Sequence, residues 1–400
     1  MKRIITMISA AAFLSAAAFA AEPKISPYGF IRNYTVFDSR EVNAGTEDLY
    51  FYMPKDLEKA VPMFRMLSLT TRMGLNLSGF DYGDTKIGGT IEADFYSMNG
   101  STAVLRMRQA YVKIAWDDFS LNVGQAWHPM AADMPHITNL ETGAPFNPFN
   151  RSPQAMLTYA ATEKLSMTGG FIYGMQYLPT GPSGKTEAYM KYGLIPEIYL
   201  GLTYKDGGFM GKVGVDVMSL KPHTNQYPGF MEDRITMVSP FLYGQYTKGL
   251  FQVKAKTILA QGGEHMNLLS GYGISREAKA GYVYTPMRDW ASFISFQYGK
   301  KFQVLGMIGY MKQLGTPDEL MRLNDGSRAI WINTAAATNI TEAFRMTPTI
   351  AWNFGKLTIS LEYNMTAARF GEGARGDHGL FEKSHWIANH RIEQMVKLNF

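Results

Sequence analysis

The chain has 400 residues, of which 46% are hydrophobic and only 18% are charged. It contains no cysteine, which excludes a disulfide scaffold and a thiolate metal site, and its many glycines and aromatic residues exclude a disordered chain. The formal net charge of +5, without a basic run, is too weak to indicate nucleic-acid binding.

Residues 1–20 have the pattern of a secretory signal peptide. Lys2 and Arg3 precede an uncharged run over 4–20, which ends in the small-x-small cleavage site Ala18-Phe19-Ala20. No later apolar run reaches the length of about 18 residues that a spanning helix needs. We therefore expect an exported chain whose mature part, residues 21–400, forms a single domain.

Segments of strand length with alternating apolar and polar residues follow. Over 64–81, one predicted face carries Leu67, Leu69, Met73, Leu75 and Leu77, and polar residues occupy the other. The segments 85–97 and 356–366 repeat this pattern, which a helix would scatter around its circumference. Strands of membrane barrels alternate in this way over roughly ten residues, with apolar side chains outside and polar ones inside.

Two features favour a membrane barrel over a soluble sandwich, which also alternates. Aromatic residues at predicted strand ends suit an interfacial girdle, namely Trp116, Trp127, Tyr246, Trp290 and Trp352. Tight turns also alternate with longer polar loops, as the short periplasmic turns of outer-membrane barrels do. These turns lie near 82–84, 117–118, 163–164, 206–208, 248–249, 299–301 and 354–356.

Seven tight turns, with both termini on the turn side, predict an all-β transmembrane antiparallel barrel of 16 strands. The expected strands are 27–38, 64–81, 85–97, 103–116, 119–128, 154–162, 165–176, 195–205, 209–219, 233–247, 250–261, 290–299, 302–312, 341–353, 357–369 and 389–400. A further strand over 278–284 would raise the count to 18. Barrels of 16 to 18 strands leave an aqueous channel.

The final segment alternates as a closing strand and ends on Phe400. It is similar to the assembly signal of Gram-negative outer-membrane proteins. We therefore expect the chain to interact with the barrel-assembly machinery and with the lipid of the Gram-negative outer membrane.

The long connection from His128 to Ser152 is rich in Pro and Asn, and long loops in compact proteins are usually functional. We expect residues 128–152 to fold into the channel and narrow it, as a loop in this place does in general porins. An external lid between protomers is the alternative.

Charged residues on the polar faces are candidates for the pore lining. The main set is Arg72, Glu92, Asp94, Arg106, Arg108, Lys212, Lys254, Lys256, Arg345 and Arg391, and Asp216, Glu362, Glu393 and Lys397 belong to the same faces. Basic residues outnumber acidic ones in these sets, which favours anionic solutes. Arg72, Arg106 and Arg108 opposite Glu92 and Asp94 would set a transverse field. The alternative is that these charges pair with one another and only solvate the wall.

Several short segments resemble DcaP-like trimeric outer-membrane porins. They are Ser26-Pro27-Tyr28-Gly29-Phe30-Ile31-Arg32, Ala110-Tyr111-Val112-Lys113, Gly124-Gln125-Ala126-Trp127-His128-Pro129, Arg151-Ser152-Pro153-Gln154 and Tyr298-Gly299-Lys300-Lys301. The resemblance implies a 16-stranded barrel, a homotrimer and passive diffusion of small organic or anionic solutes. Unlike some members, the chain shows no clear coiled coil after Ala21.

Other chemistry is weakly supported, and we predict no enzyme, cofactor or metal site. The string Gly371–Gly376 matches G-x-G-x-x-G, but no helix pattern follows it. Asp377, His378, Glu382, His385 and His390 have no metal-ligand spacing, and His128 and His136 near Asp133 lack a nearby serine for a triad. A barrel hydrolase and a non-conducting adhesin or scaffold remain the alternatives to a porin.

Overall fold

The computed structural model describes residues 22–42, 53–99, 102–140, 142–223, 233–279, 281–332 and 339–400, so the predicted signal peptide lies outside the described residues. The strands are β1 (Lys24–Asp38), β2 (Met63–Leu67), β3 (Arg72–Ser78), β4 (Lys86–Asn99), β5 (Thr102–Trp116), β6 (Phe119–Trp127), β7 (Arg151–Ala160), β8 (Leu165–Ile172), β9 (Thr180–Gly181), β10 (Gly184–Lys185), β11 (Glu197–Asp206), β12 (Phe209–Leu220), β13 (Ile235–Lys248), β14 (Phe251–Gln261), β15 (Gly271–Ala278), β16 (Gly281–Gly299), β17 (Phe302–Gly315), β18 (Ile330–Ile332), β19 (Ile340–Met346), β20 (Thr349–Phe354), β21 (Leu357–Glu372) and β22 (Lys383–Asn399). In the described parts of the chain, two short helices, α2 (Ala188–Lys191) and the 3-10 helix η2 (Gly263–Met266), lie in loops. Among the described residues, no helix has the length and apolar character to cross a membrane.

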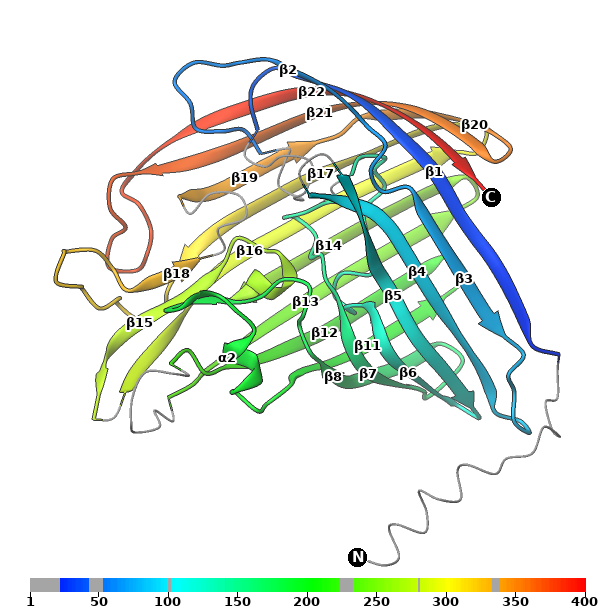
Figure 1. The fold of residues 1–400 in the computed structure, drawn as a ribbon, viewed down its shortest axis with the longest axis horizontal. Helices are drawn as coiled ribbons and strands as arrows, with labels where there is room; N and C mark the ends of the chain where they lie inside the picture. The colour runs from blue at the N-terminus through cyan, green and yellow to red at the C-terminus, as the bar shows by residue number, and fades with distance from the viewer. Residues whose placement is uncertain are drawn as a thin grey trace, which may run out of the picture.

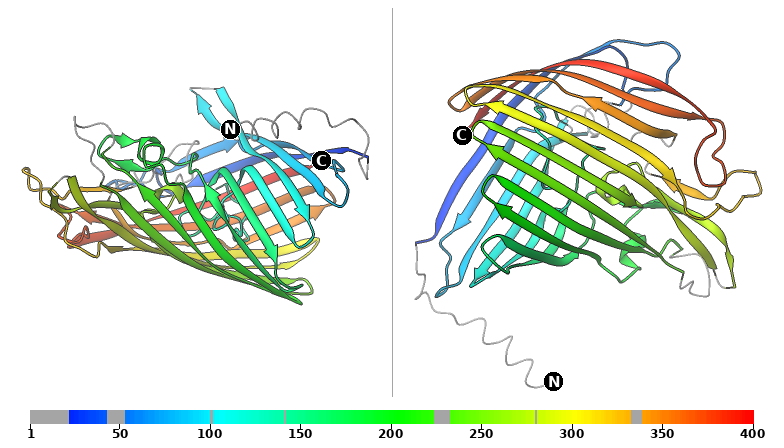
Figure 2. Two further views of the ribbon diagram at one scale, coloured as in Figure 1. Left: turned by 90° about the horizontal axis from the view of Figure 1, so that it is seen from below. Right: turned by 180° about the vertical axis from the view of Figure 1, so that it is seen from behind.

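The strands form a closed antiparallel barrel, seen from three sides in Figures 1 and 2. Two crossings are interrupted: β2 continues as β3, and β19 continues as β20 past Pro348, which cannot donate a ladder hydrogen bond. With each interrupted crossing counted once, the described chain forms the predicted ring of 16 strands. The possible 18-strand count is wrong, because residues 281–284 of the possible extra strand form the start of β16, which pairs directly with β14, and β15 stays outside the ring.

All seven predicted tight turns join neighbouring strands, for example β5 to β6 and β16 to β17. Several strands are longer than predicted at their loop ends, most of all β16, which begins at Gly281, and β22, which begins at Lys383. Their added residues pair with β15 and with the end of β21. Residues 281–284 were expected only as part of a separate strand, and residues 285–289 and 383–388 were not expected as strand because their sequences do not keep one face apolar.

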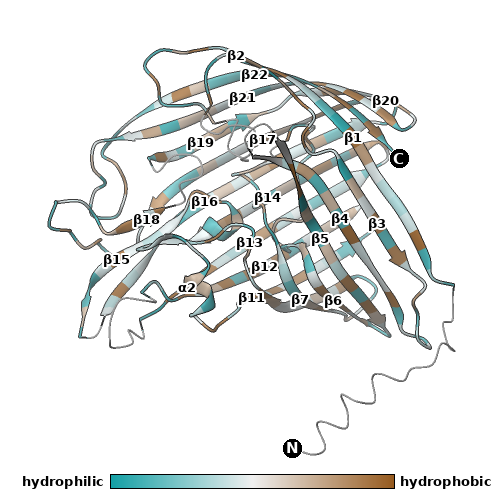
Figure 3. Ribbon diagram, in the orientation of Figure 1, coloured by the Kyte–Doolittle hydropathy of each residue, from teal (hydrophilic) through white to brown (hydrophobic). Residues whose placement is uncertain are grey.

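The two faces of the wall differ in the way that a membrane barrel requires. Side chains such as Ile91, Leu200 and Ile294 are exposed on the outside, whereas the neighbouring Asp94 and Glu362 are buried inside. Figure 3 shows hydrophobic and hydrophilic residues alternating along many strands. The apolar outer face can meet lipid, while polar groups stay within the barrel.

The predicted lipid-facing position of Leu67 and Leu69 is wrong. Both are buried, at 8% and 6% exposure, whereas Phe64 and Met66 are 64% and 63% exposed. On β1, Tyr34 pairs with Leu67 of β2 and Phe30 pairs with Arg72 of β3. The chain advances by five residues from Leu67 to Arg72 but by only four between their partners on β1, so one residue between β2 and β3 has no partner on β1. This extra residue, between β2 and β3, reverses which positions face inward.

One predicted girdle residue, Trp127, also lies inside the barrel. Its ring contacts that of Phe149 edge-on at 5.1 Å, and the Arg151 guanidinium lies 4.8 Å from it. Tyr246, Trp290 and other aromatic residues are exposed on the outside as expected. Position near a strand end therefore did not suffice to assign Trp127 to the lipid face.

The barrel closes where β22 meets β1. The backbone of Phe400 donates to Gly29 at 3.0 Å and accepts from it at 3.3 Å. A Cβ atom on Gly29 would lie 2.6 Å from the Phe400 ring, so glycine gives the ring its space. The last residue is thus part of the seam.

Candidate functional site in the barrel lumen

The segment between β6 and β7 is bonded to inward-facing side chains of the barrel wall. We call residues 129–150 the loop segment. Lys212 Nζ lies 2.7 Å from Asp133 Oδ2, and Lys254 Nζ donates to the Met134 carbonyl at 3.0 Å. Lys256 Nζ donates to the Met130 carbonyl and to Asn147 Oδ1 at 2.7 and 2.6 Å. These three predicted pore-lining lysines all contact the loop segment.

A second group of contacts joins the loop segment to other strands. Glu362 accepts from Thr138 N at 3.1 Å and from Asn139 Nδ2 at 2.6 Å. Tyr34 OH donates to the Thr138 carbonyl at 2.9 Å, and Arg345 Nη1 donates to the Ala144 carbonyl at 2.9 Å. The loop segment is therefore held by strands from distant parts of the ring.

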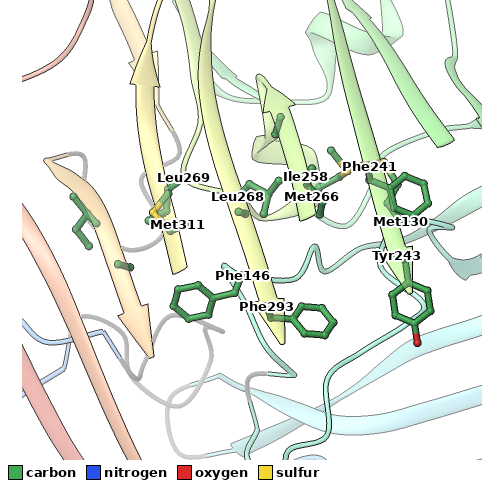
Figure 4. Close-up of a cluster of buried hydrophobic side chains, with 14 of the residues drawn as sticks. Met130, Phe146, Phe241, Tyr243, Ile258, Met266, Leu268, Leu269, Phe293 and Met311 are labelled. Atoms are coloured by element: carbon green, nitrogen blue, oxygen red, sulfur yellow. The ribbon is translucent and has the colours of Figure 1, made fainter. Parts of the chain in front are cut away.

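Apolar side chains of the loop segment also pack against the barrel wall. Figure 4 shows Met130 and Phe146 of the loop segment among wall side chains that include Phe293 and Met311. Phe146 fits over Gly309, where a Cβ atom would lie 2.4 Å from the ring. Leu140 packs in a separate cluster with Tyr34 and other residues near the closing seam.

A cavity of about 300 Å³ lies between the loop segment and the wall. Arg32 and Lys397 line it, together with His136, polar side chains from β16, β17, β20 and β21, and loop residues 134–139. Arg32 Nε donates to Thr70 Oγ1 at 2.8 Å. Among the described residues, the cavity lining includes no carboxylate, and no ion pair is formed by Arg32 or Lys397. Burial and Lys254 lower the pKa of His136 to about 4, so its imidazole is neutral at neutral pH.

The predicted charges of β3, β4 and β5 form one acid–base cluster. Arg108 bonds Glu92 at 2.7 Å and Asp94 at 2.6 Å, and Arg106 bonds Asp94 at 2.8 Å. Arg72 lies at 3.6 Å from Glu92 and 3.9 Å from Asp94. Three guanidinium groups thus surround two carboxylates at ion-pair distance. This is the arrangement that the alternative of mutually paired wall charges predicts.

The structure separates Arg391 from these groups. It pairs with Asp38 across the closing seam and lies 3.7 Å from Glu393. Arg345, also buried, donates to Thr366 Oγ1 at 2.8 Å as well as to the loop segment. Both residues hold parts of the barrel together.

A separate buried cluster, which we call the histidine–carboxylate cluster, joins His128 and His265 to Glu197 and Asp216. His128 Nε2 lies 2.7 Å from Glu197 Oε1 and 3.6 Å from Asp216 Oδ1. His265 Nε2 lies 3.5 Å from Glu197 Oε1 and 3.4 Å from Asp216 Oδ2. Burial alone would lower the pKa of His128, but the two carboxylates raise it to about 9, and the same opposing effects raise the pKa of His265.

Sequence reasoning missed most of this histidine–carboxylate cluster. Asp216 was expected only as a wall charge, and His128 was considered beside Asp133, which instead contacts Lys212. Glu197 and His265 come from separate loops and strand ends, so no spacing links them. Arg32 was also missed as a lining residue, although it has the inward-facing position on its predicted strand.

The glycine-rich string and the late histidines discounted in the sequence analysis lie near the end of β21 and on β22. The Gly371–Gly376 string lies at the end of β21 and is followed by a loop. His385 contacts Asp56 and Glu372, whereas His390 contacts Tyr363.

Comparisons with known proteins identify the fold. No family model and no curated protein matches the chain. The outer membrane channel DcaP of Acinetobacter baumannii has a TM-score of 0.71 at 16% identity, over 97% of this chain and 99% of that one. An anion-selective porin from Comamonas acidovorans has a TM-score of 0.57 at 9% identity, over 95% and 100% of the two chains. OmpF of Salmonella typhi has a TM-score of 0.53 at 10% identity, over 94% and 98%. The chain thus has the barrel fold of outer-membrane porins, and its resemblance to DcaP-like porins is confirmed at the level of the fold.

Proposed function

We propose that the protein is an outer-membrane porin through which small polar or anionic solutes diffuse passively. In this proposal the loop segment narrows the water-filled barrel, and solutes pass beside it. The loop segment bonds to Lys212 and Lys256 on one side and packs Leu140 near the closing seam on another. Contacts with such widely separated strands support a position across the lumen.

The observation that carries the solute preference is the charge of the cavity beside the loop segment. Arg32 and Lys397 line it, and the described lining residues supply no carboxylate to neutralise them. A low-dielectric wall with one sign of charge concentrates the opposite ions. Arginine and lysine linings suit anions.

The acid–base cluster adds to this preference. Arg72 and Arg106 keep 20% and 25% side-chain exposure, whereas Asp94 is fully buried beneath them. Water and solutes therefore meet more of the guanidiniums than of the carboxylates. Glu92 and Asp94 weaken the positive field without reversing it, because three cations surround two anions.

We also infer that the protein is exported with residues 1–20 as a cleaved signal peptide and assembles as a homotrimer. One structure with this fold is a trimer form of OmpT from Vibrio cholerae. Recognition of the last strand by the barrel-assembly machinery completes the proposal, and the place of Phe400 in the seam supports it.

Liposome swelling tests the proposal. Vesicles containing the purified protein should swell in small neutral sugars and faster in small organic anions of equal size. Matched vesicles without protein should not swell. Absence of swelling would favour a scaffold, while hydrolysis of lipid or peptide in the same vesicles would favour a barrel hydrolase.

A further inference from the structure

We propose that His128, His265, Glu197 and Asp216 bind one divalent transition-metal ion of the Zn²⁺ class, which joins the start of the loop segment to the barrel wall. The four residues come from four places: the residue after β6, the first residue of β11, the middle of β12 and the helix η2. They share no sequence motif, and only the closed barrel brings them together.

The distances fit a compact coordination site. His128, Glu197 and Asp216 can each offer a ligand atom within 4.8 Å of the others. His265 lies outside this compact group of three, but its Nε2 lies 3.5 Å from Glu197 Oε1 and 3.4 Å from Asp216 Oδ2, so it is the candidate fourth ligand. Ligands at about 2.0–2.1 Å from a tetrahedral ion are separated by about 3.3 Å, so small movements of these side chains would suffice.

The cluster also contains acceptors that lack donors. His265 Nε2, Glu197 Oε2 and both carboxylate oxygens of Asp216 have no hydrogen-bond partner among the described residues. All four side chains in the cluster are between 0 and 2% exposed. Buried carboxylate oxygens without hydrogen bonds are costly, and a divalent cation would neutralise both carboxylates at once.

The two histidines differ in the contact that their Nδ1 atoms make, and this contact affects whether Nε2 is free to coordinate a metal ion. His265 Nδ1 faces the Gly262 carbonyl at 3.3 Å, the usual arrangement for an imidazole that coordinates through Nε2. Met130 N lies 3.2 Å from His128 Nδ1 and can donate to it only when the imidazole is neutral and protonated at Nε2. Coordination by His128 Nε2 requires its proton to move to Nδ1 and this bond to be replaced. His265 therefore needs no change of tautomer to coordinate through Nε2, whereas His128, a member of the compact group, does.

The ligand set selects the type of metal. Two imidazole nitrogens with carboxylate oxygens suit Zn²⁺ and similar ions, whereas Ca²⁺ and Mg²⁺ prefer oxygen ligands throughout. Protons are the competing occupants, because two imidazolium groups would also balance two carboxylates.

Metal retention by the full barrel in detergent tests the proposal. The protein is stripped with a chelator, incubated with zinc chloride at neutral pH and desalted, and its zinc is measured by mass spectrometry. Wild type should retain one equivalent, and excess Ca²⁺ should not displace it. His265→Gln and Glu197→Gln should lose this equivalent, while His390→Gln, an exposed control, should keep it.

Zinc retention by wild type no greater than in protein-free detergent would overturn the proposal, as would equal retention in His265→Gln and Glu197→Gln. Heat-modifiable gel mobility shows which variants are folded. If neither variant folds, X-ray absorption at the zinc edge of wild type decides the matter. Histidine scattering in the first coordination shell supports the site, and an all-oxygen shell rejects it.

Discussion

Arg391 and Asp38 form a bidentate pair, with Nε to Oδ1 and Nη2 to Oδ2 both at 2.7 Å. Both side chains are buried, and they join β22 to β1. Asn389 Nδ2 adds a third donor to Asp38 at 2.7 Å. The seam between the last and first strands therefore depends on a charge pair as well as on backbone hydrogen bonds.

Replacing Arg391 with methionine should destabilise the barrel by about 3–5 kcal/mol, because Asp38 would remain buried with only the more distant Arg65, at 3.8 Å, as a cation. Urea unfolding in lipid vesicles, followed by tryptophan fluorescence, measures the change. Lys300→Met at an exposed turn should shift stability by less than about 0.5 kcal/mol. Equal stability of the two variants would show that the pair does not hold the seam.

Gly309→Val should loosen the loop segment, because a Cβ atom at this position would meet the Phe146 ring. Overpacking of this kind costs about 1–3 kcal/mol. Limited chymotrypsin digestion should then cut the loop segment about tenfold faster than in wild type if cleavage follows local opening. Gly244→Val is the matched control, since a Cβ atom added at Gly244 would meet no other atom within 4 Å. Unchanged cleavage in Gly309→Val would argue against Phe146 as an anchor.

Arg32→Gln and Lys397→Gln should each lower the ratio of chloride to potassium permeability. Each change removes a positive charge from the cavity lining. A unit charge about 8 Å from a passing ion contributes about 0.5 kcal/mol in water, or roughly a twofold change in the ratio. Reversal potentials in planar bilayers measure it, with the exposed turn variant Lys301→Gln as the control. A similar change of the permeability ratio in Lys301→Gln would show that anion preference follows the net charge of the protein and not the charge of the cavity lining.

Asp94→Asn should act in the opposite direction. It removes one of two carboxylates from among Arg72, Arg106 and Arg108, so chloride preference should increase. The variant should also be less stable, because Arg108 is buried and loses a charged partner. Measuring reversal potential and urea stability on one preparation tests both effects; a shift toward cations would contradict the placement of this cluster.

The barrel could be predicted from sequence because the same pattern, an alternating strand followed by a tight turn or a longer loop, recurs along the chain. Alternation of apolar and polar residues marked each crossing, and tight turns gave the pairing of neighbours. The failures occurred where this repetition is interrupted. One extra residue after Leu67 reversed the faces of its strand, and Trp127 turned inward to meet Arg151 and Phe149.

The candidate site was less predictable, because it is assembled from distant segments. Arg108 with Glu92 could be anticipated, since neighbouring strands bring them together. The meeting of His265 with Glu197 depends on two loops whose paths leave no periodic signal. The same holds for the cavity between Arg32 and the loop segment.

The ion preference of the open channel tests the account most directly. Purified protein is inserted into a planar bilayer with a potassium chloride gradient, and the reversal potential is recorded for single insertions. The proposed anion-preferring channel should conduct steadily, with a reversal potential displaced from zero toward the equilibrium potential of chloride. A potential displaced toward that of potassium, or protein that inserts without conducting, would contradict it.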